Sequence, residues 1–227
     1  MTEKAAEGLR IEIRPGETVS GLLLRPSAPR ACYVLAHGAG AGMTHASMGA
    51  IATGLGQRGI ASLRYQFPYM EKGSKRPDAP AVAHAAVRAA VKEAARCCPG
   101  LPLVAGGKSF GGRMTSQAQA LAALPDVRGL AFLGFPLHPA GKPSSDRANH
   151  LADVKLPMLF LQGTRDALAE LSLLKPVVNG LGPRATLHLL EAADHSFHVL
   201  KSSGRTDRAV LDEALDAFAA WVDGIIG

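Results

Sequence analysis

The chain has 227 residues, of which 47% are hydrophobic, and 25 basic and 19 acidic side chains give it a formal charge of +6. Glycine and proline together make up about 18% of the chain, below the share typical of low-complexity sequences, so a core can form. The length favours one globular domain over residues 1–227 and argues against two large ones.

The charge and the apolar runs limit the partners that the chain can have. Its basic residues are scattered and not interleaved with aromatic residues, so we expect a solvated basic surface and no nucleic-acid partner. No apolar run approaches the roughly 18 residues of a membrane span, and residues 1–8 lack the apolar core of a signal peptide. We therefore predict a soluble, cytoplasmic protein with no membrane partner, and leave a homodimer open.

The three cysteines predict neither a disulfide framework nor a metal site. Cys32 lies in an apolar run, while Cys97 and Cys98 are adjacent, so no Cys-x-x-Cys pair can be built. We expect reduced, structural thiols.

The elements follow a simple order along the chain. Two short strands at 9–13 and 19–24 predict a small antiparallel edge, and a denser apolar run follows at 31–36. Helices are expected at 45–56, 80–96, 112–123, 167–179 and 206–225. Further strands are expected at 60–65, 102–106, 129–135, 157–162 and 185–190. This alternation predicts an α/β fold, with a mainly parallel sheet of about eight strands flanked by helices.

Two of these helices show opposite patterns. The last helix has an apolar stripe at intervals of three and four residues, which is typical of core packing. In the helix at 80–96, His84, Arg88, Lys92 and Arg96 share one face, which predicts a solvated outer surface.

Three motifs resemble cofactor or metal sites but lack the required context. Gly54 to Gly59 matches G-x-G-x-x-G, yet it closes a helix and precedes a strand, where no pyrophosphate could meet free helical N–H groups. Gly107-Lys108-Ser109 resembles the end of a P-loop, but a loop cannot form because Pro102 lies within the preceding strand. His195 and His198 have no Cys or Glu at a known metal-ligand spacing. We expect no cofactor and no metal.

The strand at 102–106 runs into Gly107-Lys108-Ser109-Phe110-Gly111 and then into a helix, the context that a nucleophile elbow requires. The tight turn strains the serine, and side chains two positions to either side would collide, which explains glycine at 107 and 111. The alternative interpretation is a generic glycine turn in which Ser109 caps the helix.

A serine nucleophile needs a histidine base, and that base needs a carboxylate to orient it. Asp166 follows the strand at 157–162, and His195 follows the strand at 185–190, in the chain order serine, acid, histidine. Taken singly, Asp166 could be a helix cap and His195 an ordinary loop residue. Together they predict a catalytic triad of Ser109, Asp166 and His195.

The loop after the strand at 31–36 is rich in small residues, which let backbone amides approach a developing oxyanion. We predict that the amides of Ala39 and Phe110 form this oxyanion hole. The alternative is a flexible glycine loop.

Sites in open parallel sheets form beyond the carboxyl ends of the strands, where all these residues lie. Segments 65–70 and 135–138 should then wall the pocket, although core packing of their aromatic residues is an equal alternative. Lys108 and Arg165 are expected to be solvent-facing or structural, or to favour anionic substrates. The predicted substrate-binding residues are His37, Gly38, Gly40, Phe67, Tyr69, Met70, Leu137 and His138.

From Ala31 onward the chain resembles the α/β-hydrolase superfamily, and among its dienelactone-hydrolase-like members the testis-expressed protein thirty group. The motifs that carry the resemblance are His37-Gly38-Ala39-Gly40, Phe67-Pro68-Tyr69-Met70, Gly107 to Arg113, Pro136-Leu137-His138-Pro139, Gln162 to Asp166 and Asp194-His195-Ser196-Phe197. The resemblance implies a cofactor-free serine hydrolase with Ser109, Asp166 and His195 at the triad positions.

The segment between the sixth and seventh main strands is too short for a large cap, so we expect an open pocket for a small-molecule acyl substrate, first of all a small or accessible ester or thioester. The same family also contains chromatin-complex subunits, which leaves a non-catalytic protein-interaction module as the alternative. The intact triad positions favour the enzyme.

Overall fold

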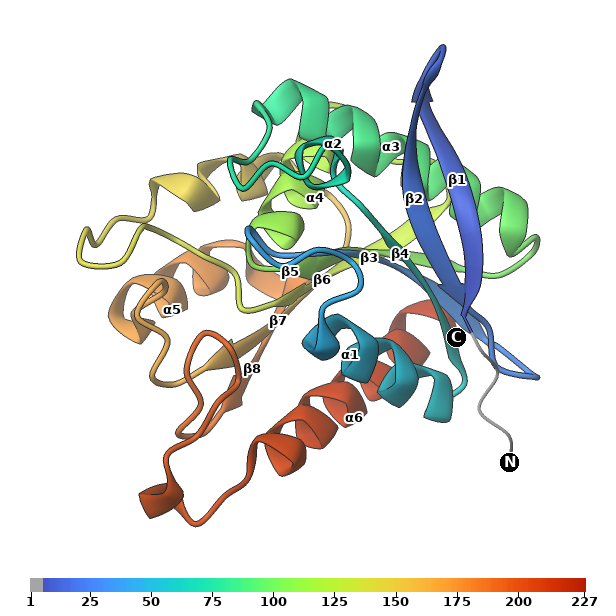
Figure 1. Ribbon diagram of the computed structural model, residues 1–227. Coiled ribbons are helices and arrows are strands. Elements are labelled where there is room, and N and C mark those ends of the chain that lie inside the picture. The colour runs from blue at the N-terminus through green and yellow to red at the C-terminus, as the bar shows by residue number, and fades with distance from the viewer. Residues whose placement is uncertain (1–5) are drawn as a thin grey trace.

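The computed structural model describes residues 6–227, which form an eight-stranded sheet flanked by helices (Figure 1). In space the strand order is β1-β2-β4-β3-β5-β6-β7-β8. The pairs β1–β2 and β2–β4 are antiparallel, and every other neighbouring pair is parallel. The strands are β1 (Glu7–Arg14), β2 (Glu17–Leu24), β3 (Ala31–Ala36), β4 (Ile60–Tyr65), β5 (Leu103–Lys108), β6 (Val127–Leu133), β7 (Met158–Gly163) and β8 (Ala185–Leu190).

Helices cover both faces of the sheet. Helices α1 and α6 pack on one face, and α3, α4 and α5 pack on the other (Figure 1), so two apolar cores form. The α-helices are α1 (Ala46–Gln57), α2 (Pro68–Glu71), α3 (Pro80–Cys97), α4 (Phe110–Leu121), α5 (Leu171–Gly180) and α6 (Asp207–Ile226). Short 3₁₀-helices are η1 (Asp146–Asp153), η2 (Gly182–Arg184) and η3 (Lys201–Ser203). The predicted α/β architecture, with a mainly parallel eight-stranded sheet and an antiparallel N-terminal edge, is confirmed.

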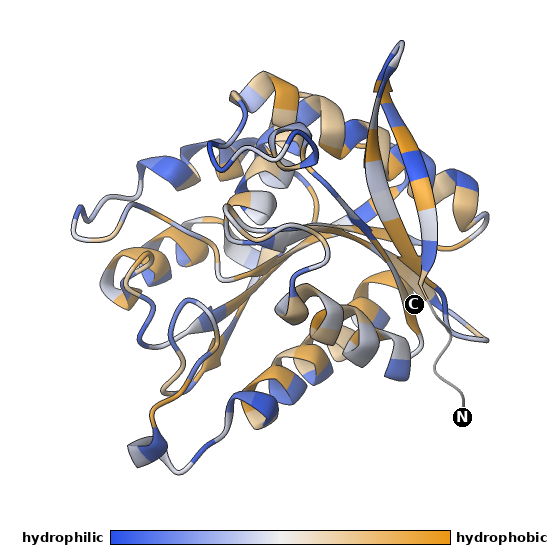
Figure 2. Cartoon of the chain, in the orientation of Figure 1, coloured by the Kyte–Doolittle hydropathy of each residue, from blue (hydrophilic) through white to orange (hydrophobic). Residues whose placement is uncertain are grey.

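The central strands are hydrophobic because both of their faces are covered. Every residue of β3, β4 and β7 is buried. Figure 2 shows α6, which packs on the sheet, with alternating orange and blue segments. In α6 the predicted apolar stripe is also buried, with Val210, Leu215 and Phe218 each at most 1% exposed. This core fixes the carboxyl ends of the parallel strands, where the predicted site residues lie.

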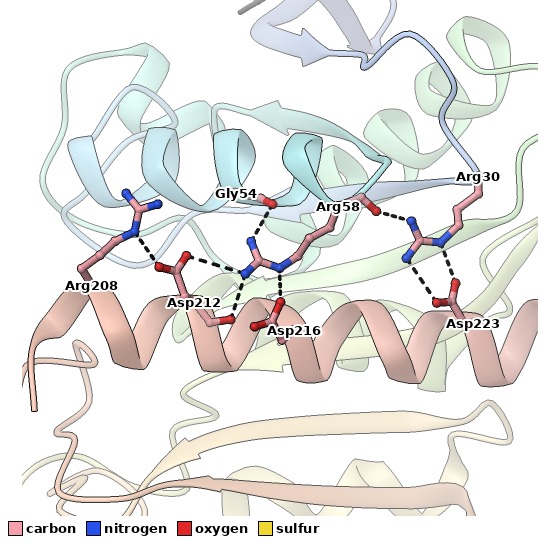
Figure 3. Close-up of polar contacts among 7 residues, drawn as sticks. All are labelled: Arg30, Gly54, Arg58, Arg208, Asp212, Asp216 and Asp223. Carbon is pink, nitrogen blue, oxygen red and sulfur yellow. Dashed lines mark hydrogen bonds and ion pairs between the residues drawn. The ribbon is translucent and has the colours of Figure 1, made fainter. Parts of the chain in front are cut away.

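Polar contacts hold α6 against α1 (Figure 3). Arg58, directly after α1, donates to the Asp216 carboxylate at 2.7 Å and to the Asp212 carbonyl oxygen at 3.2 Å. Farther along α6, Asp223 accepts from Arg30 at 2.6 Å. Exposed pairs of this kind contribute at most about 1 kcal/mol each, so the apolar core remains the main source of stability.

The predicted element bounds differ from the structure at two helices near the site. Helix α4 begins at Phe110 and not at 112, because Gly111 and Gly112 lie inside its first turn. Helix α5 begins at Leu171 and not at 167, since an Asp166 carboxylate oxygen accepts the Leu168 N–H at 2.8 Å and turns the chain first.

The polar face of α3 is less solvated than predicted. Arg88 donates to the carbonyls of Ala118 and Ala122 at 2.5 and 2.8 Å, and so satisfies the last turn of α4. His84 contacts Gln117 of the same helix at 3.3 Å. Half of this face is therefore a contact between helices.

The chain between β6 and β7, residues 134–157, contains only the 3₁₀-helix η1, so no large cap covers the sheet in the described part of the chain. Within residues 6–227, no helix combines the length and the apolar character needed to span a bilayer.

Candidate active site

Ser109 occupies a sharp turn between β5 and α4, with φ 51° and ψ −117°. Such a conformation is strained for a residue with a side chain and is common at functional sites. Ser109 stands at the N-cap position of α4, but its hydroxyl makes no capping hydrogen bond. The alternative that Ser109 serves as a helix cap is therefore wrong.

The glycines around Ser109 are required by close approaches of the backbone. A Cβ atom at Gly107 would lie 2.2 Å from the Ala36 carbonyl oxygen, and one at Gly111 would lie 2.6 Å from the His37 oxygen. A Cβ at Gly106 would lie 1.8 Å from the Ala131 oxygen. The predicted steric reason for glycine at 107 and 111 is confirmed, and it comes from the end of β3 packing against the elbow.

The structure brings Ser109, His195 and Asp166 together from three separate loops. His195 Nε2 lies 2.8 Å from Ser109 Oγ, and His195 Nδ1 lies 2.7 Å from Asp166 Oδ2. Since an ionised carboxylate only accepts hydrogen bonds, Nδ1 carries the imidazole proton and Nε2 is free to accept from the serine hydroxyl. The Asp166 side chain has no exposed surface, while that of His195 is 21% exposed. The arrangement can transfer a proton from a hydroxyl that substrate can reach.

Asp166 is held by further hydrogen bonds. Gln162 Nε2 donates to the same carboxylate oxygen that faces His195, and the Leu168 amide donates to the other. Gln162 Oε1 in turn accepts from the Phe135 amide at 2.9 Å, which ties the acid to the end of β6. Our sequence reasoning missed Gln162, although its position at the end of β7, four residues before the acid, was visible.

The loop that carries His195 is fixed to the elbow by Lys108. Lys108 Nζ donates to the His195 carbonyl oxygen at 2.7 Å and lies 4.5 Å from the centre of the Phe197 ring. Burial lowers the pKa of Lys108 to about 8, and the charges of Asp166 and Asp194 oppose that shift. The ammonium group is therefore protonated at neutral pH and is structural, one of the alternatives left open by the sequence.

Gly134, directly after β6, allows the same loop to approach. It has φ +73°, and a Cβ atom there would lie 3.2 Å from the His195 oxygen and 3.4 Å from the imidazole Nδ1. No sequence pattern predicted this contact, because Gly134 and His195 are 61 positions apart.

His37 is a fixed, neutral part of the loop after β3. Its Nδ1 donates to the Gly38 carbonyl oxygen at 2.8 Å, so Nε2 accepts the Phe67 N–H at 3.0 Å. Burial lowers the pKa of His37 to about 4, partly opposed by the Gly38 hydrogen bond. The ring therefore joins this loop to the segment after β4.

The loop that carries the predicted oxyanion donor Ala39 packs against the nucleophile at Gly38. A Cβ atom at Gly38 would be 3.7 Å from Ser109 Cβ, so the loop packs directly against the serine. Phe110 is the first residue of α4, where backbone N–H groups have no partner within the helix. The Gly40 amide donates to the Tyr69 hydroxyl at 3.4 Å, which leaves the exposed Ala39 at the tip of the loop.

Most of the predicted substrate-binding side chains are buried and do not face solvent. Of the eight, only Gly40 is exposed and Met70 half-buried. His37, Phe67, Leu137 and His138 have no exposed surface, and Tyr69 has 3%. The Leu137 and His138 amides both donate to the Leu168 oxygen, at 2.8 and 3.2 Å. The six buried residues hold the loops in place, and direct contact of their side chains with a substrate would require them to move.

An open groove lies elsewhere, between β8 and α6. Leu159, His188 and Trp221 are among its lining residues, and none of the predicted site residues belongs to it.

The fold and the serine elbow at the carboxyl edge of the sheet define the class of the α/β hydrolases. The chain belongs to this class: residues 29–223 match the family model described as the alpha/beta hydrolase domain. Among solved structures it is similar to a dienelactone hydrolase from Anabaena variabilis, with 17% identity, all of both chains covered and a TM-score of 0.81. The predicted likeness to dienelactone hydrolases is thereby confirmed.

Two further solved structures share the fold. One is an alpha-beta serine hydrolase homologue from Coxiella burnetii, with 19% identity, coverage of 95% and 98% of the two chains and a TM-score of 0.74. The other is an a/b serine hydrolase without lid from Xanthomonas campestris, with 19% identity, coverage of 96% and 97% and a TM-score of 0.70.

Proposed function

We propose that the chain is a serine hydrolase that cleaves small or accessible esters or thioesters through Ser109, His195 and Asp166. The observation that carries this proposal is the position of His195, which lies within hydrogen-bonding distance of both the hydroxyl and the carboxylate. The absence of a large cap over the described residues supports an accessible acyl substrate. The name of the Anabaena relative, dienelactone hydrolase, denotes cleavage of a lactone, which is a cyclic ester.

In the first half of the reaction, His195 Nε2 accepts the proton of Ser109 Oγ as that oxygen attacks the acyl carbonyl carbon. Asp166 stabilises the imidazolium that forms and keeps the ring in its orientation. The amides of Ala39 and Phe110 donate to the oxyanion of the tetrahedral intermediate.

The intermediate collapses when His195 gives its proton to the leaving alcohol or thiol, and an acyl-Ser109 ester remains. A water molecule then attacks this ester while His195 accepts its proton. Collapse of the second intermediate releases the acid, and His195 returns the proton to Ser109 Oγ, which restores the serine hydroxyl.

A fluorophosphonate probe tests the proposal, because it reacts with serines that an adjacent base activates. We expect labelling of the intact protein at Ser109, loss of labelling in Ser109→Ala, and loss of 4-nitrophenyl acetate hydrolysis in the same variant.

Ser116→Ala is the matched control, since Ser116 also lies 2.7 Å from a histidine, His150, but is buried within α4. This variant should be labelled as the parent is. Full esterase activity in Ser109→Ala, or intact protein that the probe does not modify, would show that the chain is not a serine hydrolase.

A further inference from the structure

Two side chains at the end of β4 bind the loop of residues 37–43, which carries Ala39. Gln66 Oε1 accepts the Met43 N–H at 2.8 Å, and Arg64 Nη1 donates to the Met43 carbonyl oxygen at 3.1 Å. Most side-chain hydrogen bonds to a backbone satisfy one group of a residue, whereas here both groups of Met43 are held. The two bonds fix the position and the orientation of this end of the loop.

Gly42 is required for the approach of Gln66. A Cβ atom at Gly42 would lie 2.9 Å from Gln66 Oε1 and 3.0 Å from Nε2, closer than side chains normally approach. A larger residue at this position would push the amide group away from Met43. The glycine therefore serves the contact between the loop and the residue after β4.

A closed turn connects Met43 to the predicted oxyanion donor. The Ala41 N–H donates to the Gly38 oxygen at 3.4 Å, and Gly40 has φ +77°, as expected at the third position of a type II turn. Ala39 lies at the second position of this turn. Since a turn closed by its own hydrogen bond moves as a unit, a shift at Met43 displaces the Ala39 amide.

Arg64 is a costly residue for a contact that only stabilises the fold. It is 7% exposed, and its Nε atom is buried without a hydrogen-bond partner. In the described part of the chain its only hydrogen bond is the one to Met43, and it forms no ion pair there. A buried charge without a counter-ion and a buried donor without a partner both oppose folding. Local features that lower stability are expected at functional sites.

We propose that Arg64 and Gln66 are positioning residues, which hold the Ala39 amide at the place where the oxyanion forms. The inference rests on the proposed function, to which it adds two residues outside the triad. Neither side chain contacts the substrate in this role, because each acts through the backbone of Met43. An oxyanion donor stabilises the transition state through its fixed position, so its displacement affects kcat more than substrate binding.

Two variants of Gln66 test the proposal on 4-nitrophenyl acetate. Gln66→Met removes the acceptor of the Met43 N–H and should lower kcat about 10- to 100-fold with a change in KM below about twofold, because the donor is displaced and not removed. Gln66→Glu keeps an oxygen at the same place and should stay within about threefold of the parental kcat. Gln57→Met, at the exposed end of α1, is the matched control and should behave as the parent does.

Arg64→Met separates positioning from a purely structural role. It removes a buried charge and leaves one carbonyl oxygen without its donor, so the melting temperature should fall by no more than about 4 °C. The kcat should nevertheless fall by about tenfold or more. If Arg64→Met does not fold, the two Gln66 variants decide.

Three outcomes would overturn the proposal while the hydrolase proposal stood. Parental kcat in Gln66→Met or in folded Arg64→Met would exclude a positioning role for that residue. A rise in KM without a fall in kcat would mean that substrate binding is affected and not the transition state. An equal loss in Gln66→Glu and Gln66→Met would show that the bond to Met43 is not the cause.

Amide hydrogen exchange separates this inference from the proposed function. In the Ser109→Ala background, Gln66→Met should raise the exchange rate of segment 38–43 by about fivefold or more, and Gln57→Met should not. If the parent cleaves no ester but this difference is found, the hydrolase proposal fails and the anchoring of the loop stands. Unchanged exchange in Gln66→Met would overturn the anchoring, whatever the parent cleaves.

Discussion

Helix α4 carries two serine–histidine contacts of nearly equal length, and only one of them has the surroundings of a catalytic pair. At the start of the helix, Ser109 Oγ lies 2.8 Å from His195, and near the middle Ser116 Oγ lies 2.7 Å from His150. Ser109 lies in a strained turn and is partly exposed, whereas Ser116 is completely buried. His195 contacts the carboxylate of Asp166, and no carboxylate contacts His150 within residues 6–227.

The difference teaches that distance alone does not define a nucleophile. Ser116 can also donate to the Arg113 carbonyl oxygen at 3.0 Å, so its hydroxyl closes a contact between α4 and η1. Burial lowers the pKa of His150 to about 4, which makes this ring a neutral structural group. Access, a strained backbone and a carboxylate behind the histidine distinguish the first pair.

The largest expected effect comes from removing the carboxylate behind His195, which makes the Ser109–His195 pair resemble the Ser116–His150 pair. Asp166→Asn should lower kcat on 4-nitrophenyl acetate by about 10⁴-fold, because the asparagine amide can donate to Nδ1 and favour the wrong tautomer of His195. Asp153→Asn is the matched control, since the Asp153 charge acts on His150, the histidine of the second pair. A loss below tenfold in Asp166→Asn would remove the proposed role of the carboxylate.

A smaller effect is expected on the free energy of unfolding in acid, through the buried histidine His37. The pKa of His37 is about 4 in the folded chain and about 6.5 when unfolded, so the unfolded state binds the proton first as the pH falls. The free energy of unfolding should therefore fall between pH 6.5 and pH 4, by up to about 1.4 kcal/mol per pH unit for this ring.

Urea unfolding at pH 7, 5.5 and 4.5 measures this dependence. His37→Gln, which can still accept the Phe67 N–H, should have a shallower slope, while the remaining dependence comes from His150 and the other titrating groups. An unchanged slope would mean that His37 does not stay neutral in the folded chain.

The smallest expected effect comes from removing the hydrogen bond by which Lys108 holds the loop that carries His195. Lys108→Met removes the bond to the His195 carbonyl and should lower kcat about tenfold with little change in KM, because the base is displaced and not the substrate. Lys108→Arg should recover part of the loss. Lys92→Met, on the exposed face of α3, is the control for charge, and an equal effect in both methionine variants would exclude a positioning role for Lys108.

The sequence predicted features that depend on neighbouring residues. The elbow was predictable because its glycines lie in a short motif around Ser109, although the atoms that exclude side chains at Gly107 and Gly111 belong to the end of β3. The strands were predictable because apolar runs reflect burial on two faces. The predicted helix bounds were wrong where a side chain redirects the backbone, as Asp166 does before α5. The predicted wall residues Phe67, Leu137 and His138 proved to be buried, since a motif does not tell which way a side chain packs.

By itself, the sequence determined the fold class, the order of the elements and the turn at Ser109, because the apolar periodicity and the glycine spacing of the elbow are patterns among residues close together in the chain. Only the tertiary structure decided which of eight histidines meets which serine, and that Lys108 holds a loop 87 positions away. Those outcomes depend on distances between segments remote in the chain, and packing of the whole sheet sets these distances.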